Sequence, residues 1–390
     1  MPDFKDLFFR KGKFSFKNLF YQIPLSEESE EHQELPSKMV SCLTQEIRNL
    51  AIPSEYIEGL QSSLEDALTR WQEEEEAANE LVILGSPVEP LFKIIREALN
   101  NLQLLNDWKI SSLSFSTRPD KFFNIAKLLE TELGIDSKVN ARDNREKLKE
   151  IVVIPSVELC FLRHIAGLDA IEYLRELIFQ DRSRLWLIGC NNLTWQYLDV
   201  IYRITAYFER TITLPKLQGD TMRQTLMPLL ANNNIKLNWE KESSEEREKK
   251  LKNYFDRLAD ISEGSLAVAG ELWWRSLFPV SQKEEAGNSE EQETKIKHNE
   301  VKLGKAKAPN LPDLTAEERY LIFSILLHQK ISLQHLALSL GDPESTVQFV
   351  LQKLLQTGII KRDRLFFYID SVYYPSLKNY FKNNNFITGI

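Results

Sequence analysis

Two of the three cysteines and one of the five histidines stand close enough in sequence to suggest metal binding or nucleophilic chemistry. Cys160 and His164 are four residues apart, so a helix would place them on one face, and Cys190 follows a nearby apolar run. A zinc site needs four protein ligands, or three and a water, and no further Cys or His is close in sequence. A cysteine nucleophile needs a base and an oxyanion-binding loop, and the sequence offers neither. The pattern therefore predicts no metal site and no catalytic residue of this kind.

A segment that begins at Gly85 has the position and length of a phosphate-binding loop. Such a loop follows the pattern G-x-x-x-x-G-K-[ST], in which glycine amides cradle the phosphates, the lysine neutralises them and the hydroxyl holds magnesium. In this chain Pro90, Leu91 and Phe92 stand where Gly, Lys and Ser or Thr would be. Proline removes an amide donor, leucine removes the positive charge, and phenylalanine removes the hydroxyl. Glu89 would place a negative charge beside a triphosphate, so the segment argues against ATP hydrolysis.

A second part of the expected nucleotide chemistry is also missing. In such a site a metal-holding Asp and a catalytic Glu follow the third apolar strand. Residues 151–154 form that run here, and they lead instead into Pro155 and Ser156, with a carboxylate only at Glu158. Two independent losses thus predict a protein without ATPase activity and without a cofactor.

The elements that would position these residues are short apolar runs separated by helical patterns. The runs cover residues 81–84, 110–115, 151–154, 185–188 and 211–214, and the helical patterns cover 89–100, 119–133, 168–180 and 194–207. Continuous apolar strands that alternate with helices indicate a parallel sheet covered on both faces. An amphipathic helix with Ser54 as its N-cap precedes the sheet, and helical patterns at 220–230, 245–258 and 264–277 follow it.

A change of composition marks the boundary of a further domain. Residues 280–311 are rich in Glu, Lys, Gln and Asn and poor in large apolar residues, which is typical of a flexible tether. Helical patterns at 314–329, 333–340 and 345–357, followed by a β-rich segment at 359–374, indicate a winged helix-turn-helix. We therefore expect a basic aromatic arm and acidic linker at 1–35, an α/β domain with its helical subdomain at 36–280, a flexible linker at 281–312 and a winged helix at 313–390.

The order of these elements resembles that of the ATPase core of the AAA+ and STAND families, in which five strands and a helical lid surround a nucleotide. The resemblance covers residues 81–277 and implies a five-stranded parallel α/β sheet of the P-loop NTPase type with a helical lid, followed by an α+β winged helix. It implies that Asn191 matches a first sensor of the γ-phosphate and that Arg275, in the lid, matches a second. With Gly85 and Glu158 these residues would be relics of a degenerate nucleotide site. A strand-end cap for Asn191 and an ion pair for Arg275 are the structural alternatives.

Large aromatic residues gather at two places in the sequence. Trp273 and Trp274 lie at the end of the lid, and Phe367 and Tyr374 belong to an aromatic hairpin of the winged helix. Burial of such side chains is worth roughly 1.5–3 kcal/mol each. We therefore predict that the winged helix folds back on the lid as a protein-docking module, although each cluster can instead complete its own core.

A DNA-reading role is the alternative for the winged helix. Gln348 and Lys353 of its last helix would reach base edges, and Lys361, Arg362 and Arg364 of the wing would contact phosphates. One lysine on that helix is few for a chain with a formal net charge of −8, because phosphate contacts supply much of the affinity. Nucleic acid binding is therefore not the favoured reading.

Composition restricts the class of protein further. With 390 residues, of which 43% are hydrophobic, the chain is long enough for two or three packed domains. No apolar run approaches the roughly 18 residues that span a bilayer, and the N-terminus does not have the pattern of a signal peptide. Scattered cysteines fit a reducing compartment, so we expect a cytoplasmic protein. Basic and aromatic residues within 1–25 are compatible with contact to an anionic membrane surface.

The sequence thus favours one function over two alternatives. The leading hypothesis is a non-catalytic, ATPase-derived regulatory or scaffolding protein that acts through contacts with a protein partner. The alternatives are a DNA-binding regulator that uses the winged helix and a divergent ATPase that holds phosphates without the loop lysine.

Overall fold

A computed structural model describes residues 35–102, 105, 107–113, 117–121, 124–133, 147–239, 242–282 and 295–386. The segment 1–25, expected to contact a membrane or partner, lies outside the described residues. The apolar runs form a five-stranded sheet of β1 (Glu80–Gly85), β2 (Lys109–Ser112), β3 (Glu150–Ile154), β4 (Leu185–Asn191) and β5 (Thr211–Thr213). All neighbours are parallel, in the order β2-β3-β4-β1-β5. Every residue of β3 and β4 is buried, as in a parallel sheet covered on both faces.

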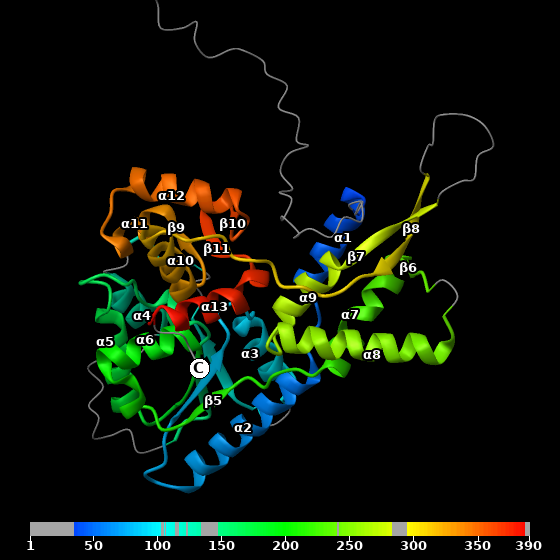
Figure 1. The fold of residues 1–390 in the computed structure, drawn as a ribbon. Helices are drawn as coiled ribbons and strands as arrows, with labels where there is room; N and C mark the ends of the chain where they lie inside the picture. The colour runs from blue at the N-terminus through cyan, green and yellow to red at the C-terminus, as the bar shows by residue number, and fades with distance from the viewer. Residues whose placement is uncertain are drawn as a thin grey trace, which may run out of the picture.

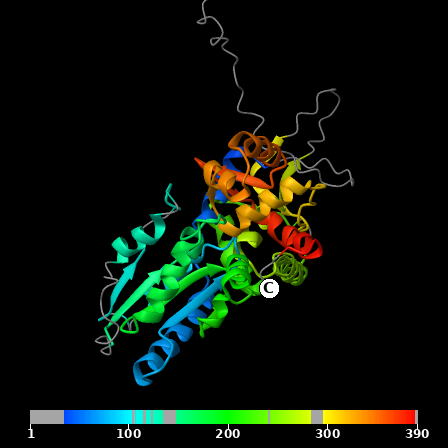
Figure 2. The same ribbon diagram turned by 90° about the vertical axis from the view of Figure 1, so that its left-hand side faces the viewer.

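The helices that follow the strands cover the two faces of this sheet (Figures 1 and 2). They are α3 (Leu91–Asn100), α4 (Ile125–Leu133), α5 (Asp169–Gln180) and α6 (Asn192–Tyr202). Because strand crossovers are right-handed, the strand order places α3 on one face and α4 to α6 on the other. The long helix α2 (Ser54–Glu73) packs against α3. Ser54 is its first residue rather than its N-cap, because Pro53 occupies the cap position and no side chain caps the helix.

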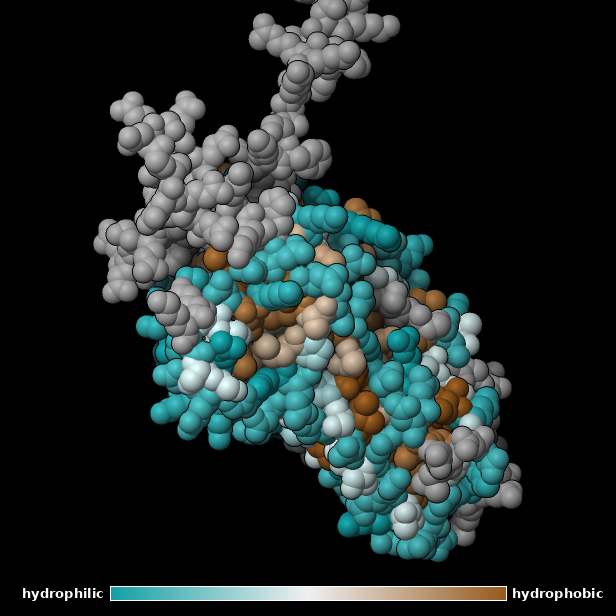
Figure 3. Space-filling view, turned by 90° about the vertical axis from the view of Figure 1, so that its right-hand side faces the viewer, coloured by the Kyte–Doolittle hydropathy of each residue, from teal (hydrophilic) through white to brown (hydrophobic). Residues whose placement is uncertain are grey.

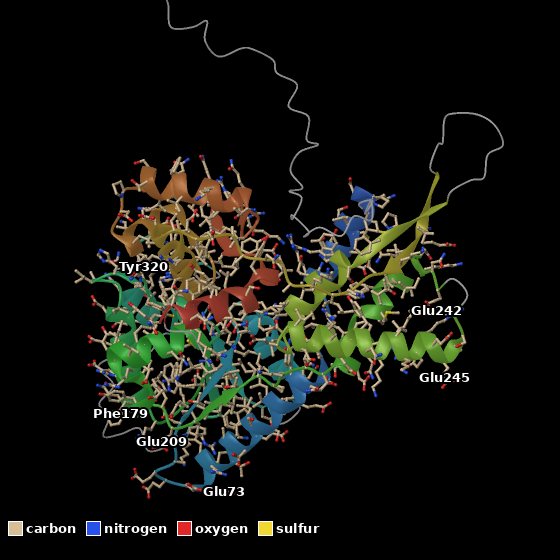
Figure 4. All side chains as sticks on the ribbon, in the orientation of Figure 1. Glu73, Phe179, Glu209, Glu242, Glu245 and Tyr320 are labelled. Atoms are coloured by element: carbon tan, nitrogen blue, oxygen red, sulfur yellow. The ribbon has the colours of Figure 1, made fainter. Side chains whose placement is uncertain are left out.

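Three helices form the lid beside the sheet. They are α7 (Gly219–Asn232), α8 (Ser244–Ile261) and α9 (Leu266–Arg275), and α9 also packs against α1 (Ser37–Arg48). Glu242 and Glu245 mark the end of α8 that lies farthest from the sheet (Figure 4). On the face that includes the lid, hydrophilic residues predominate and apolar residues gather in a band near the centre (Figure 3).

The region expected to be a flexible tether is ordered in part. Lys295–Leu303 forms the strand β8, which pairs antiparallel with β7 (Leu277–Gln282) and parallel with the short β6 (Lys236–Leu237). Val301 of β8 is completely buried. The expectation of a tether is therefore wrong for 295–303, since this polar segment gains its backbone partners from β7 and β6.

The C-terminal domain is a winged helix. It contains α10 (Ala316–His328), α11 (Leu333–Leu340) and α12 (Glu344–Gln356), and a small sheet in the order β10-β11-β9. The strands are β9 (Ile331–Ser332), β10 (Ile360–Asp363) and β11 (Phe366–Ile369), and a 3-10 turn η6 (Ser371–Tyr373) and α13 (Tyr374–Asn383) complete the domain.

Figure 1 shows the winged helix, in orange and red, above the α/β domain and beside the lid. The predicted fold class is confirmed in its architecture: a five-stranded parallel α/β sheet with a helical lid, followed by an α+β winged helix. Among the described residues, no helix is long and apolar enough to cross a membrane.

Candidate functional site

In the segment after β1, backbone N–H groups donate hydrogen bonds to acceptors of the same segment. The Glu89 N–H donates to Ser86 O at 3.1 Å, the Leu91 N–H donates to Glu89 O at 2.9 Å, and the Val88 N–H donates to Ser86 Oγ at 3.3 Å. Two further residues of the segment are prolines, which have no N–H. A phosphate cradle needs amides that point at the ligand, and most amides of this turn are already occupied.

The two residues after the turn face different environments. Leu91, at the position of the phosphate-loop lysine, is 4% exposed and belongs to the core, whereas Phe92, at the position of the hydroxyl, is 49% exposed. The Arg96 guanidinium lies 5.6 Å from the Phe92 ring centroid. The nearest cation that follows in sequence is Lys93, whose Nζ donates to Leu50 O. Sequence reasoning missed Lys93, because it stands two residues after the motif position.

Glu89 lies between the loop and the lid. Its Oε1 accepts the Ser265 Oγ–H at 2.5 Å and the Ala267 N–H at 3.5 Å, at the start of α9. Burial raises the pKa of the Glu89 carboxyl, and the donors from the lid lower it in part. Gly85, where β1 ends, pairs in register with Asn191 of β4.

The Glu158 side chain is buried next to Asn191, at the carboxyl end of β4. Glu158 belongs to the 3-10 turn η4 (Val157–Leu159), is 1% exposed, and accepts the Ser156 Oγ–H at 2.6 Å and the Asn191 N–H. The Arg118 guanidinium donates to the carbonyl oxygens of Phe161, at 2.6 Å, and of Glu158. Burial raises the pKa of Glu158 and lowers the pKa of Arg118 to about 10. Glu158 is thus engaged with the protein around it, and Arg118 carried no motif that would have revealed this role.

Asn191 acts as a helix cap. Its Oδ1 accepts the Thr194 N–H at 2.8 Å at the start of α6, and its Nδ2 donates to Leu327 O of the winged helix at 3.5 Å. The Thr194 hydroxyl donates to the same carbonyl. The position that the resemblance matches to a sensor therefore contacts the C-terminal domain.

Arg275 joins the lid to the winged helix. Its guanidinium lies 2.6 Å from Asp370 and 3.3 Å from Glu271, and Lys361 lies 3.1 Å from Asp370. Asp370 is 3% exposed. Burial alone would raise the pKa of Asp370, but Arg275 and Lys361 hold it below its ordinary value. Arg275 is therefore part of a buried ion-pair network between two domains.

A second contact connects the winged helix to the α/β domain. The Arg163 N–H donates to His328 Nε2 at 3.1 Å, and the Arg163 guanidinium donates to Ser339 O at 2.8 Å. His328 Nδ1 lies 2.7 Å from Ser324 O, which fixes a neutral ring that donates through Nδ1 and accepts through Nε2. Burial lowers the pKa of His328 well below its ordinary value. His328 is thus a packed interface residue.

The aromatic residues expected to dock the winged helix lie elsewhere. Trp273 is completely buried, and Phe367 is 6% exposed in β11, which lies between β10 and β9. Trp274 donates to Glu271 Oε2 at 3.1 Å. Only Tyr374 reaches across, through a hydrogen bond with Ser86 of the loop. The lid and the winged helix are in contact through Arg275 with Asp370, Lys378 with Glu263 and the Ser371 hydroxyl with the Ala267 carbonyl.

The candidate nucleic-acid residues are divided between exposed side chains and side chains that form ion pairs. Gln348, Arg362 and Arg364 are exposed. Lys353 forms an ion pair with Glu318 at 2.7 Å, and Lys361 belongs to the Asp370 network. Residues 313–390 contain eight Lys or Arg and seven Asp or Glu, so the formal net charge of this domain is +1.

A cavity of about 540 Å³ lies where the loop, the lid and the winged helix meet. Its walls include Tyr56, Glu89, Lys93, Ala267, Lys361 and Asp370. The residues around this cavity therefore include members of the loop, the lid and the winged helix.

The sulfur and imidazole groups form no metal centre in the part of the chain that the structure describes. Cys160 and Cys190 are buried, and burial raises the pKa of the Cys160 thiol to about 12 and raises that of Cys190 as well. Thiols that stay protonated at neutral pH are poor nucleophiles and poor ligands.

Comparisons with known proteins give structural neighbours only. No protein family model and no curated protein matches the chain. Among solved structures, a RuvB mutant from Thermotoga maritima is 15% identical over 82% of this chain and 94% of that chain, with a TM-score of 0.34. The Aeropyrum pernix ORC1 protein in complex with DNA is 12% identical over 86% and 95%, with a TM-score of 0.37. The Cdc6p protein from Pyrobaculum aerophilum is 13% identical over 83% and 94%, with a TM-score of 0.35. At these identities and scores, no role of a residue transfers from these proteins to this chain.

Proposed function

We propose that this chain is a non-catalytic, ATPase-derived regulatory or scaffolding protein that acts through contacts with a protein partner. The observation that carries this proposal is the loop after β1. Most of its amides are bonded to its own chain, and Leu91 is buried at the position of the phosphate-binding lysine. An ATPase stabilises transferred phosphate with free amides, a lysine and magnesium, and this loop supplies none of the three in that arrangement.

The contacts of the remaining candidate residues support the same proposal. Glu158 is enclosed, Asn191 caps α6, and Arg275 is paired with Asp370. Each group that the resemblance matches to nucleotide chemistry is bonded instead to a neighbouring part of the protein.

Isothermal titration calorimetry with ATP and ADP at millimolar magnesium tests the proposal. We expect no saturable heat and no release of phosphate from the wild type. Lys93→Ala is the informative variant, because Lys93 is the loop-adjacent cation that lines the cavity. ATP binding that Lys93→Ala abolishes, together with hydrolysis that Glu158→Gln abolishes, would overturn the proposal and favour the divergent ATPase.

An exposed face of the α/β domain is the surface we assign to the partner. Phe179 of α5 and Tyr207 after α6 are 67% and 51% exposed. The Arg175 guanidinium lies 4.7 Å from the Tyr207 ring and that of Arg182 lies 5.6 Å from the Phe179 ring. Figure 4 places Phe179 at the outer edge of the molecule. Exposed aromatic and arginine side chains are the types enriched in protein interfaces.

This assignment is tested by comparing proteins captured from native extract by the wild type and by variants. Phe179→Ser with Tyr207→Ser is expected to lose the captured partner. Phe349→Ser is the matched control, because Phe349 is 73% exposed on α12 of the other domain. Loss of the partner with Phe349→Ser alone would move the surface to the winged helix.

DNA binding through the winged helix is the second candidate, favoured by the exposure of the outer side of α12. Gln348 lies on that side, and Arg362 and Arg364 are exposed at the wing. The ion pairs of Lys353 and Lys361 leave few cations for phosphates, so we place this function behind the first.

A further inference from the structure

The first turn of the lid helix α9 has backbone donors that the helix itself does not use. Ser265 is the N-cap: its Oγ accepts the Val268 N–H at 3.3 Å and its carbonyl accepts the Ala269 N–H at 2.9 Å. The N–H groups of Leu266 and Ala267 precede these bonds and need acceptors from outside the helix. The positive end of the helix dipole lies at the same place.

Glu89 supplies the missing acceptor. Its Oε1 receives the Ala267 N–H and the Ser265 hydroxyl, and Leu266 also donates to the carboxyl through its backbone. The residue is 7% exposed. Within the described residues, no Lys or Arg forms an ion pair with Glu89, so its partners are the donors of the lid. A carboxyl group on the loop thus occupies the kind of site at which a helix N-terminus would hold an anion.

The opposite end and the side of α9 are tied to the winged helix. Arg275, its last residue, pairs with Asp370, and the Ser371 hydroxyl donates to Ala267 O at 3.1 Å. Lys378 of α13 lies 2.7 Å from Glu263, just before the lid helix. α9 therefore links the loop after β1 to the C-terminal domain.

We propose that the Glu89 carboxyl is a built-in substitute for a bound anion, which holds the lid closed and the winged helix docked without any nucleotide. This inference rests on the proposed function, since a loop that bound phosphates would make the link to the lid through a ligand. Here the link is part of the polypeptide. The loop after β1, the lid and the winged helix consequently keep one arrangement. A partner therefore meets the same surface at every nucleotide concentration.

Hydrogen exchange of Glu89→Ala tests the link. We expect exchange in segments 264–276 and 366–376 to accelerate by roughly tenfold or more, because a hydrogen-bonded charged group contributes about that factor. Glu80→Ala is the matched control, since Glu80 is also buried and accepts a backbone N–H, from Glu209 at 2.9 Å, away from the lid. It should leave both segments unchanged. Unchanged exchange of 264–276 in Glu89→Ala overturns the proposal, and acceleration confined to 264–276 removes its part about the winged helix.

Chemical rescue separates an anion site from a general packing defect. Acetate fits the volume left by the carboxyl group, so it should slow exchange at 264–276 in Glu89→Ala, relative to chloride at matched ionic strength. It should have no such effect on Glu80→Ala or on the wild type. Equal effects of acetate and chloride on Glu89→Ala contradict the idea that this position is an anion site.

Glu89→Asp keeps the test decisive if Glu89→Ala does not fold. The shorter side chain preserves the acidic group but withdraws it from Ser265 and Ala267, so the same segments should exchange faster. Exchange identical to the wild type would overturn the proposal. ATP binding by the wild type in calorimetry would overturn the proposed function by a different measurement, and the two failures are therefore distinguishable.

Discussion

The Arg275 guanidinium lies 2.6 Å from the Asp370 carboxylate, and this pair joins the last residue of the lid helix to the wing strand end of the C-terminal domain. Lys361 approaches the same carboxylate at 3.1 Å. Asp370 is almost completely buried, so its charge depends on these two cations rather than on water.

Asp370→Asn should therefore destabilise the folded chain by about 3 kcal/mol, because Arg275 and Lys361 lose their nearest buried carboxylate and keep only the more distant Glu271. Asp363→Asn is the control in the neighbouring strand, where the pair with Lys330 at 2.8 Å is exposed. That change should cost less than about 1 kcal/mol. Urea unfolding measures the free energy of unfolding of both variants. Equal decreases would show that the buried Asp370 pair stabilises the fold no more than the exposed Asp363 pair does.

Restoring the missing lysine of the phosphate loop should not restore nucleotide binding. Leu91→Lys places an ammonium group in the core without a partner, and we expect it to lower the free energy of unfolding by several kcal/mol. Phe92→Lys, one residue later, should change stability by less than about 0.5 kcal/mol because Phe92 is half exposed. Thermal unfolding and calorimetry with ATP compare the two variants. A stable Leu91→Lys protein that binds ATP would mean that the loop can adopt a phosphate-binding geometry.

Parts of this structure follow from local sequence and parts do not. The runs at β1, β3 and β4 were predictable because central parallel strands are apolar throughout. The strand β8 was not, since its residues form a strand only by pairing with β7 and β6. α1 and α13 also carried no interpretation from their sequence.

The candidate site also combines features that the sequence predicts with features that it does not. Loss of the phosphate-loop residues is visible in the sequence, because that motif is contiguous. The bonds from Glu89 to Ser265 and from Arg275 to Asp370 join residues 176 and 95 positions apart. No spacing rule connects them. Trp273 and Phe367 were proposed as docking residues because large aromatic residues gather at those two places, and such clustering does not distinguish a docking residue from a core residue.

DNA binding, if present, should depend weakly on salt. Among the described residues, Lys353 and Lys361 form ion pairs and Arg362 and Arg364 do not, and each phosphate contact contributes roughly −0.9 to the slope of log affinity against log salt. We expect a slope no steeper than about −2 with duplex DNA. Fluorescence anisotropy at several salt concentrations measures it. A slope near −5, reduced by Arg362→Ala with Arg364→Ala, would favour the DNA-binding regulator.

Glu150, at the start of β3, makes the stability of the α/β domain depend on pH. Burial alone would raise the pKa of its carboxyl, but hydrogen bonds from Lys109, Arg184 and Ser111 lower it from 4.5 to about 2. The folded-state pKa lies below the unfolded value, so the stabilisation is complete above pH 4.5 and is lost as the pH falls toward 2. Glu150→Gln should remove at most about 2 kcal/mol at neutral pH, because water screens the largely exposed Lys109, and it should flatten stability across that acid range.

Glu80→Gln is the opposite case: burial raises the pKa of Glu80, so the wild-type carboxyl penalises the fold as the pH rises above 4.5. Urea unfolding from pH 2 to 7 should therefore show slopes that change in opposite directions for the two variants, and parallel curves for Glu150→Gln and the wild type would contradict the assignment.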